Sequence, residues 1–393
     1  MKLLVVVSSL DLTQPFSATP AWWQLLKALY EIGVEIVAAP YQGKPIEALW
    51  WRQAANPARW QGDLFKWLRD TARRALPMRP APPTDDESGF DWLVRRTAQA
   101  LIAPLWERHL DRILTQQPDI DALLFLTVPL NHLRGVPSAL YAKHRKPIFY
   151  YDGDVPASLP NMRGFASGFR IYQGADLSEY AAFICNSTGG CDLLRALGAR
   201  AAHAVWYGAD PSVFSPLDVP QDVDVMFYGH GREYRGEWID AMLRDPSNAL
   251  PTAVFRVRGL GLGDIGRAQP LPYLSFSKLR EYVCRSRINL CITRGAHASV
   301  YGSSSSRPFE LASLGACVVS NPYDGLELWF EPEKEVFVVH SAEEAVDRYR
   351  YLLAHEAERR AVGERARARL LAEHTFQHRA RQLVAILQGY IRG

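Results

Sequence analysis

Runs of apolar residues alternate with helically spaced segments along the first half of the chain. Continuous Val, Leu and Ile runs are typical of strands that are covered on both faces, as in a parallel sheet. The helical segments between these runs predict repeated βαβ units. Strands are expected at residues 3–8, 34–39, 122–128, 147–151 and 181–186, and helices at residues 21–32, 64–76 and 92–114.

A second series of the same kind begins near residue 222. Strands are expected at residues 223–228, 253–257, 288–292, 316–320 and 336–339, and helices at 236–243, 277–284, 307–314 and from 341 onward. The pattern predicts an α/β protein with two Rossmann-like, doubly wound parallel-sheet domains that face a cleft. Such sheets bind ligands outside the carboxyl ends of their strands, so we expect an extended, phosphate-bearing ligand.

The boundary between the two series falls in a segment with turn-forming residues, Gly208, Pro211 and Pro216. We therefore predict an N-terminal domain over residues 1–206, a linker over 207–220 and a C-terminal domain over 221–375. A last helix over 376–393 remains, and packing of this helix back on the first domain is left open.

Composition excludes several classes of protein. The 393 residues are 48% hydrophobic and 22% charged, as in an ordinary globular protein, and the net charge of +3 does not indicate a nucleic-acid partner. Five cysteines without C-x-x-C spacing favour reduced thiols over a disulfide framework or a zinc site. No apolar segment approaches the roughly 18–20 residues that span a bilayer, and the first apolar run ends at Ser8, too early for a secretion signal. These features predict a cytoplasmic protein.

Tryptophan is concentrated in the N-terminal part of the chain, in and before an expected helical insertion at about residues 45–118. Aromatic side chains dominate protein cores, so packing is the first expectation for most of these residues. The segment 64–76 is amphipathic and basic, which leaves peripheral membrane contact open. Eight of the 11 tryptophans lie in the first 106 residues: Trp22, Trp23, Trp50, Trp51, Trp60, Trp67, Trp92 and Trp106.

The segment with the clearest chemistry is Gly302 and the four serines that follow it, which lead into the expected helix at 307–314. Pro308 suits the first turn of a helix, where its missing N–H costs nothing. The free N–H groups and the dipole of such a helix end attract phosphate, although the segment also fits a flexible loop. Glu310 lies four residues after Ser306, one too many for a capping box, so its carboxylate is available to a diol.

At this point the chain resembles the GT-B glycosyltransferases, within the superfamily that contains the retaining family 4 enzymes, and most closely the CgeB-like branch associated with spore maturation. The resemblance covers residues 175 to 380 well and the preceding residues weakly. It rests on segments in a fixed order: Ile184 to Ser187, Tyr207 to Pro216, Val225 to Gly229, Arg287 to Leu290, Arg307 to Gly315, Asp324 to Glu327 and Glu373 to Phe376.

The resemblance implies a transferase that takes a nucleoside diphosphate sugar, with UDP as the expected nucleotide, and that uses no cofactor and no catalytic metal. Glu310 would bind the ribose hydroxyls. Arginine suits a leaving diphosphate because its guanidinium group can donate to two phosphate oxygens and stays charged. Arg235 also fits a surface ion pair. The remaining donor-site residues implied are Gly229, His230, Arg232, Arg235, Ser304, Ser305, Ser306 and Arg307.

The chain departs from the family pattern at Gly302, where family 4 enzymes carry the first of two glutamates. A glycine has no side chain with which to contact the donor sugar, so the sugar and the retaining stereochemistry are in doubt. Two other functions stay open: a non-catalytic nucleotide-sugar-binding or assembly protein, and a nucleotide-sugar epimerase.

The N-terminal domain is expected to bind the acceptor, whose class (saccharide, protein, lipid or small molecule) the sequence does not define. Asp152 and Asp154 follow an expected strand and are candidates for the group that accepts the acceptor proton, although Asp-Gly-Asp is also strong turn chemistry. His132, after another expected strand, is a weaker candidate for this base. In the loop after the first strand, Thr13, Gln14 and Ser17 are candidate contacts for donor or acceptor.

Overall fold

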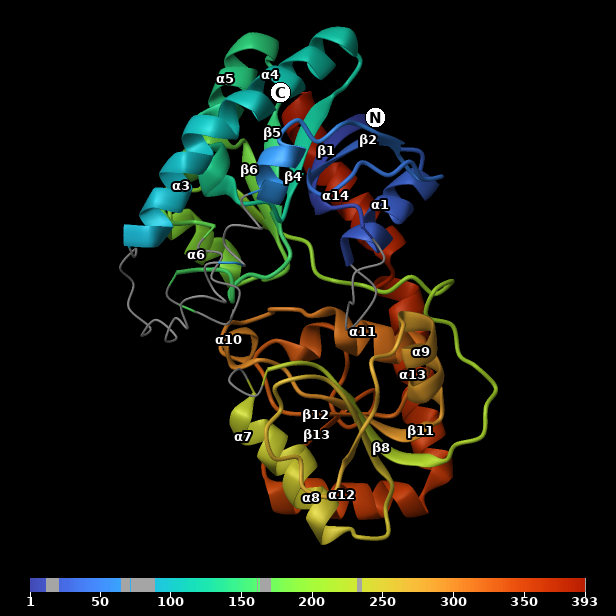
Figure 1. The fold of residues 1–393 in the computed structure, drawn as a ribbon. Coiled ribbons are helices and arrows are strands. Elements are labelled where there is room, and N and C mark those ends of the chain that lie inside the picture. The colour runs from blue at the N-terminus through green and yellow to red at the C-terminus, as the bar shows by residue number, and fades with distance from the viewer. Residues whose placement is uncertain are drawn as a thin grey trace. The chain divides into compact units, whose positions relative to one another are not determined.

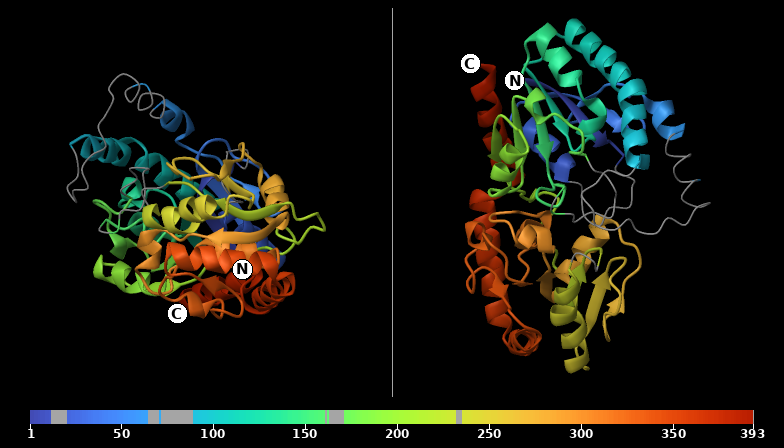
Figure 2. Two further views of the ribbon diagram at one scale, coloured as in Figure 1. Left: turned by 90° about the horizontal axis from the view of Figure 1, so that it is seen from below. Right: turned by 90° about the vertical axis from the view of Figure 1, so that its left-hand side faces the viewer.

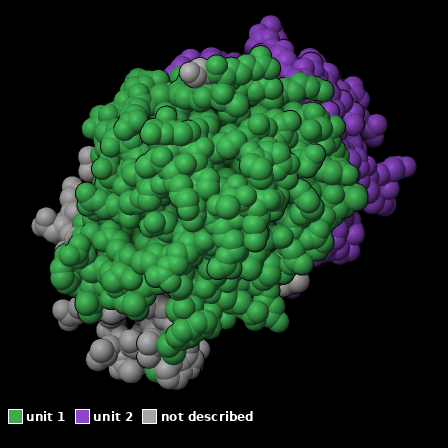
Figure 3. Space-filling view, turned by 90° about the horizontal axis from the view of Figure 1, so that it is seen from above, with its two compact units in different colours: residues 1–12, 29–205, 381–393 green, residues 13–28, 206–380 purple. Residues whose placement is uncertain are grey.

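The computed structural model describes residues 1–11, 21–64, 71, 89–160, 162, 171–231 and 235–392. The chain divides into two compact units, which Figure 3 colours separately. Unit 1 comprises Met1–Leu12, Leu29–Val205 and Arg381–Gly393, and unit 2 comprises Thr13–Ala28 and Trp206–Ala380. Each unit is built around one parallel sheet, as the sequence predicts.

Unit 1 contains a seven-stranded sheet in the order β3-β2-β1-β4-β5-β6-β7. Each pair of neighbouring strands is parallel. The apolar runs that predicted strands are almost completely buried, because both faces of the sheet are covered. The strands are β1 (Lys2–Ser9), β2 (Glu35–Gln42), β3 (Arg52–Gln53), β4 (Ala122–Leu126), β5 (Ile148–Asp152), β6 (Ala182–Cys185) and β7 (Ala202–Ala204).

Helices cover both faces of this sheet (Figures 1 and 2). One face packs against α4 (Ala103–Gln116), α5 (Val136–His144) and α6 (Gly190–Ala196). On the other face, Tyr390 of α14 (Phe376–Ile391) lies edge-on to Phe149 of β5, with 5.5 Å between the ring centroids.

The single helix expected over residues 92–114 is wrong in one respect, since the structure has two helices there. They are α3 (Gly89–Leu101) and α4, which are separated at Ile102. Pro104 lies at the start of α4 and has no N–H to donate to the turn before it, so the first helix ends. Earlier in the chain, α1 (Ala21–Glu31) forms where a helix is expected.

Unit 2 contains a six-stranded parallel sheet in the order β10-β9-β8-β11-β12-β13. In both sheets the strand order reverses beside the first strand, between β1 and β4 and between β8 and β11. This reversal is the topological switch point at which open α/β sheets bind ligands. The strands are β8 (Val223–Tyr228), β9 (Phe255–Arg258), β10 (Gln269–Pro270), β11 (Ser286–Cys291), β12 (Val318–Ser320) and β13 (Phe337–Val338).

The second sheet also has two helical layers. One face packs against α9 (Phe276–Cys284), α11 (Ser306–Ser313) and α13 (Glu356–Glu373). The other packs against a continuous helical stretch and α12 (Ala342–Ala354). This stretch consists of α7 (Gly236–Ile239), a π-helical turn at Asp240–Arg244 and α8 (Asp245–Ala249), and a short α10 (Gly295–Ala298) follows β11.

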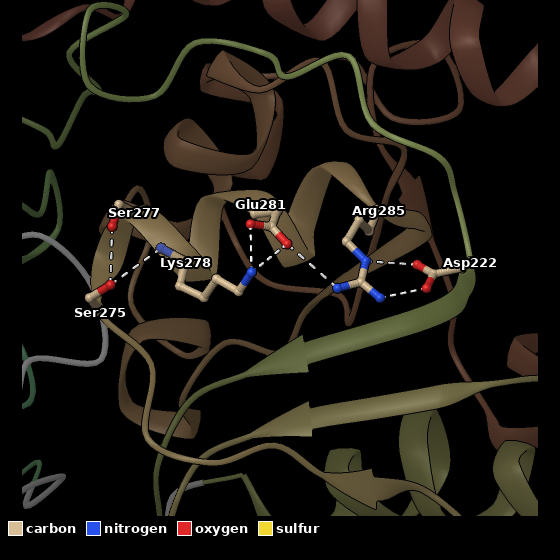
Figure 4. Close-up of polar contacts among 6 residues, drawn as sticks. All are labelled: Asp222, Ser275, Ser277, Lys278, Glu281 and Arg285. Atoms are coloured by element: carbon tan, nitrogen blue, oxygen red, sulfur yellow. Dashed lines mark hydrogen bonds and ion pairs between the residues drawn. The ribbon is translucent and has the colours of Figure 1, made fainter.

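A chain of polar contacts ties α9 to the segment before β8 (Figure 4). Lys278 Nζ lies 2.7 Å from Glu281 Oε1, and Glu281 in turn pairs with Arg285. Arg285 Nε donates to Asp222 Oδ1 at 2.8 Å, and its fork makes a second bond to the same carboxylate. Because these groups are exposed or partly exposed, the pairs contribute orientation more than stability.

The segment that the sequence predicts as a linker packs against the end of α13. Ala209 N donates to His374 O at 3.3 Å, and Phe376 N donates to Ala209 O at 3.1 Å. Asp210 accepts a hydrogen bond from Lys27 Nζ at 2.7 Å. The linker segment is thus held at several points inside unit 2.

Gly208→Ala is expected to destabilise this packing. A Cβ at position 208 would lie 2.6 Å from His374 O and 3.0 Å from the carbonyl carbon of Thr375, and both are backbone atoms that cannot move aside cheaply. We expect the free energy of unfolding to fall by about 1–3 kcal/mol in urea titrations. Gly236→Ala is the control, because no atom lies within 4 Å of its added Cβ. Equal stability of the two variants would contradict the prediction.

Candidate donor site in the second unit

Cationic side chains converge at the switch point of the unit 2 sheet. Arg235 Nε and Arg307 Nη1 donate to the same acceptor, the carbonyl oxygen of Ile292 just after β11, at 2.8 and 3.1 Å. Arg235 also donates to the carbonyl oxygen of His230, just after β8. Arg258 ends β9 and is 1% exposed. Three guanidinium groups thus gather at the carboxyl ends of three adjacent strands.

His230 lies next to these arginines. Its Nδ1 accepts a hydrogen bond from Leu260 N at 2.9 Å, and its Nε2 lies 3.1 Å from Arg258 Nη1. Burial lowers the pKa of His230, and the charges of Arg258, Arg235 and Arg307 lower it further. The charges of these three arginines favour an anionic ligand at this edge.

Gly229 leaves the space that Arg307 occupies. The Arg307 guanidinium carbon lies 5.3 Å from the ring centroid of Phe227 and 5.1 Å from that of Tyr228. A Cβ on Gly229 would lie 2.9 Å from Arg307 Nη2 and 2.8 Å from Phe227 Cζ. The glycine after β8 therefore permits the arginine to stack on the two rings.

Glu310 is buried beside this cluster, with 1% of its surface exposed. Its Oε2 accepts a hydrogen bond from Tyr228 Oη at 3.0 Å, whereas Oε1 has no hydrogen-bond partner of good geometry among the described residues. Burial raises the pKa of Glu310 to about 7, although Tyr228, Arg307 and Ser306 each act to lower it. The carboxyl group therefore has an unused acceptor oxygen.

The serines before α11 have different roles. Ser303 Oγ donates to Val300 O at 2.7 Å, and the Oγ of the fully buried Ser304 accepts from Tyr207 N at 2.9 Å. A ligand contact through the Ser304 hydroxyl is therefore not supported, because that group holds the linker segment. Ser305 and Ser306 are partly exposed and stand at the start of α11 with their N–H groups.

Gly302 has a backbone role. Its φ of 62° lies in the left-handed region that favours glycine, and its N–H donates to Asp324 O at 3.0 Å. A Cβ on Gly325 would lie 2.3 Å from Gly302 N, so the two chain segments cross in close contact.

In unit 1, the prediction of Asp152 as a catalytic carboxylate is not supported. Asp152 is fully buried, and its oxygens accept hydrogen bonds from Tyr172 Oη at 2.6 Å, Ser158 Oγ at 2.5 Å and Asp154 N at 2.9 Å. Burial raises its pKa, and these three donors offset part of that rise. Asp152 is the side chain that organises the loop after β5, as Asp does in turns. Asp154 is partly exposed and remains a candidate.

His132 lies in a 3₁₀ turn, Leu130–Leu133, shortly after β4. Its Nδ1 lies 2.9 Å from Tyr41 Oη. Burial lowers the pKa of His132 to about 4, and the charge of Arg95 adds to the effect. The ring is neutral at neutral pH and is too weak a base for the role that the sequence suggests.

Several predicted features lie outside the described residues: Arg232, Thr13, Gln14, Ser17, Trp67 and nearly all of the expected helix at 64–76. Within the described part of the insertion, Trp51 and Trp106 are buried, as packing predicts, whereas Trp60 and Trp92 are 68% and 49% exposed.

Two further residues, without a predicted role from the sequence, lie beside the candidate site. Arg258 and Tyr228 are the last residues of β9 and β8. A charged residue at the carboxyl end of a strand was the available signal for Arg258, because strand ends meet at the ligand edge.

Three other features bear on possible function: metal-binding groups, membrane-spanning helices and cysteine thiols. The described part of the chain contains no group of three or more His, Cys, Asp or Glu side chains placed to hold a metal ion. No helix among the described residues is long and apolar enough to cross a bilayer. All five cysteines are free thiols, as expected, and Cys185 and Cys191 have their sulfurs 3.7 Å apart.

A family model described as glycosyl transferase-like matches residues 232–385, which include the arginines and Glu310. This region of the chain is therefore similar to glycosyl transferase-like domains. No curated protein matches the chain. The assignment to the CgeB-like branch stays a prediction.

Solved structures show the same fold over the whole chain. Sucrose-phosphate synthase from Thermosynechococcus elongatus aligns with a TM-score of 0.68 at 14% identity, covering 99% of both chains. Anabaena HepE in complex with UDP aligns with a TM-score of 0.62 at 13% identity, covering 99% of this chain and 100% of HepE. An E. coli trehalose-6-phosphate protein bound with UDP-2-fluoro glucose aligns with a TM-score of 0.65 at 13% identity, covering 98% of each chain. At these identities the likeness establishes the GT-B fold.

The raised pKa of Glu310 predicts a specific pH dependence of stability. The pKa of its carboxyl group rises from the ordinary value of 4.5 in the unfolded chain to about 7 in the folded protein. The stability that the group contributes is therefore full below pH 4.5 and is lost as the pH rises toward 7. Glu310→Gln removes this dependence. From pH 4.5 to 8, the variant should gain up to roughly 3 kcal/mol relative to the wild type in urea unfolding.

Glu281→Gln is the control for this measurement. The contact with Lys278 lowers the pKa of Glu281. The stability that Glu281 contributes is therefore present above its unfolded pKa and is lost as the pH falls. A stability difference between Glu310→Gln and wild type that does not change with pH would contradict the buried, proton-retaining state of Glu310.

Proposed function

We propose that the chain transfers a sugar from a nucleoside diphosphate sugar, with UDP as the nucleotide, to an acceptor bound by unit 1. The glycosyl transferase-like match over residues 232–385 supports this activity. UDP is favoured because two proteins of the same fold hold UDP or a UDP-sugar analogue.

The observation that carries the proposal is the guanidinium cluster at the switch point. In sugar transfer, the bond from the sugar to the diphosphate breaks and the leaving diphosphate gains negative charge. Fixed positive groups that face this charge lower the barrier, and arginine stays charged throughout. We assign Arg235, Arg258 and Arg307 to the diphosphate, with the N–H groups of Ser305 and Ser306 as further donors.

Glu310 is assigned to the ribose. A ribose hydroxyl can donate to Oε1, the oxygen without a good partner, while the Tyr228 hydroxyl holds Oε2 in place. A buried acceptor of this kind discriminates well, because a ligand without the hydroxyl leaves it unsatisfied.

We propose that the Asp154 carboxylate accepts the proton that the acceptor hydroxyl loses during transfer. We also propose that transfer proceeds with retention, as in the enzymes that the sequence resembles. Asp154 is chosen because it is partly exposed, in contrast to the buried Asp152.

The nucleotide assignment is testable by calorimetry with UDP and with UDP-sugars. Arg307→Gln removes a charge from the cluster, and charge-assisted bonds to phosphate are strong, so we expect affinity for UDP to fall roughly 10- to 100-fold. The matched control is Arg285→Gln, which removes the same charge from the surface network in Figure 4 and should change affinity less than about twofold. Equal losses in both variants would show that the cluster is not the diphosphate site.

The fate of the donor then distinguishes the functions. Release of UDP that depends on an added acceptor supports the transferase. Isomerised donor without UDP release indicates an epimerase, and tight binding without turnover indicates a non-catalytic binding protein. Either of the last two outcomes would overturn the proposal.

We also propose that transfer needs no divalent metal, because the arginine cluster can neutralise the diphosphate by itself. The transfer rate should then be the same in EDTA as in Mg²⁺ or Mn²⁺. A rate that EDTA abolishes and Mn²⁺ restores would contradict this assignment.

A further inference from the structure

Tyr41 and His132 form a hydrogen-bonded pair at the carboxyl edge of the unit 1 sheet. Tyr41 lies near the end of β2, and His132 lies in the turn that follows β4. The Tyr41 hydroxyl oxygen is 2.9 Å from His132 Nδ1. No described residue forms a hydrogen bond with Nε2, so this nitrogen is available to a ligand.

The surroundings of Tyr41 fix its ring. Trp106 of α4 stacks on it at 5.7 Å between centroids with 17° between the planes. Trp106 is fully buried, and Asn56 Nδ2 donates to the carbonyl oxygen of Tyr41 at 3.0 Å. The hydroxyl therefore has one well-defined position relative to the imidazole.

The direction of the hydrogen bond follows from the number of available partners. A neutral imidazole carries one proton, on Nδ1 or on Nε2. If Nδ1 carried it, Nδ1–H would donate to Tyr41, and the buried hydroxyl proton would have no acceptor among the described residues. If the hydroxyl donates to Nδ1, both groups are satisfied and the ring proton resides on Nε2.

The charges around the pair keep this arrangement over a wide pH range. Among the described residues, the titratable groups near His132 are Tyr41 on β2 and Arg95 on α3, and His109 of α4 makes an edge contact with Trp106. Burial and the Arg95 charge lower the pKa of His132 to about 4, and burial raises the pKa of Tyr41. Neither group changes its charge between pH 5 and 8.

We propose that Tyr41 is a positioning residue that fixes His132 with its proton on Nε2, so that His132 donates a hydrogen bond to an oxygen of the bound substrate. The fixed proton follows from the geometry alone, whereas the role in transfer rests on the proposed function. His132 is then a hydrogen-bond donor instead of the base that the sequence suggests. The ligand group is a sugar hydroxyl or an anionic oxygen, since both accept hydrogen bonds.

The first test is nitrogen NMR of the full chain labelled with ¹⁵N-histidine, in the wild type and in Tyr41→Phe. In the wild type, we expect His132 to show a protonated Nε2 and a hydrogen-bonded, unprotonated Nδ1 at pH 6 to 8. In Tyr41→Phe, the Nδ1 resonance should move to the position of a nitrogen that accepts no hydrogen bond. A proton on Nδ1 in the wild type, or an Nδ1 resonance that the substitution leaves unchanged, would overturn the proposal.

Tyr150→Phe is the matched control. It removes a buried hydroxyl from the same sheet, one that donates to Val128 O at 2.6 Å and does not contact His132. This variant should leave the His132 nitrogen resonances as in the wild type.

The second test is kinetic. Tyr41→Phe should lower kcat roughly fivefold or more with little change in the KM for the donor, because a misplaced donor group costs rate more than ground-state binding. An unchanged kcat in a variant whose Nδ1 resonance has moved would refute the role in transfer. If the wild type transfers no sugar, the proposed function fails and the NMR result still decides the tautomer.

Discussion

The carbonyl oxygen of Ile292 accepts hydrogen bonds from two guanidinium groups, and much of unit 2 is arranged around that concentration of positive charge. Like charges this close repel one another unless backbone oxygens and aromatic faces hold them. The carbonyls after β8 and β11 and the rings of Phe227 and Tyr228 supply these contacts. Glycine at position 229 leaves room for this arrangement, because an added Cβ would lie 2.9 Å from Arg307 Nη2.

Burial, and not the positive charge of the cluster, sets the unusual state of Glu310. A carboxylate close to the arginines would ordinarily ionise at low pH, yet burial raises its pKa to about 7 against their influence. The group therefore does not fully cancel the positive charge of the cluster near neutral pH. An anionic ligand meets both an attractive potential and a nearby acceptor oxygen that burial has kept from water.

The strands with long apolar runs were predictable because burial on both faces demands such runs. The edge strands β3, β7 and β10 were not predicted, since two or three residues carry no periodic signal. The position of the candidate site was predictable as well, because the resemblance and the strand-end rule place Arg307 and Glu310 at one edge, where the structure brings them near one another. Side-chain partners were not predictable. Asp152 bonds to Tyr172, 20 positions away, and such tertiary contacts decide whether a polar residue faces a ligand or another chain segment.

The two sheets share a reversal of strand order but differ in the electrostatics of their ligand edges. In unit 2 the switch point collects charged arginines. In unit 1 the corresponding edge carries a neutral His132, and burial favours the protonated form of Asp152. A neutral imidazole such as that of His132 suits hydroxyl-bearing ligands, whereas a cationic edge suits a diphosphate. This difference between otherwise similar units supports assigning the donor to unit 2 and the acceptor to unit 1.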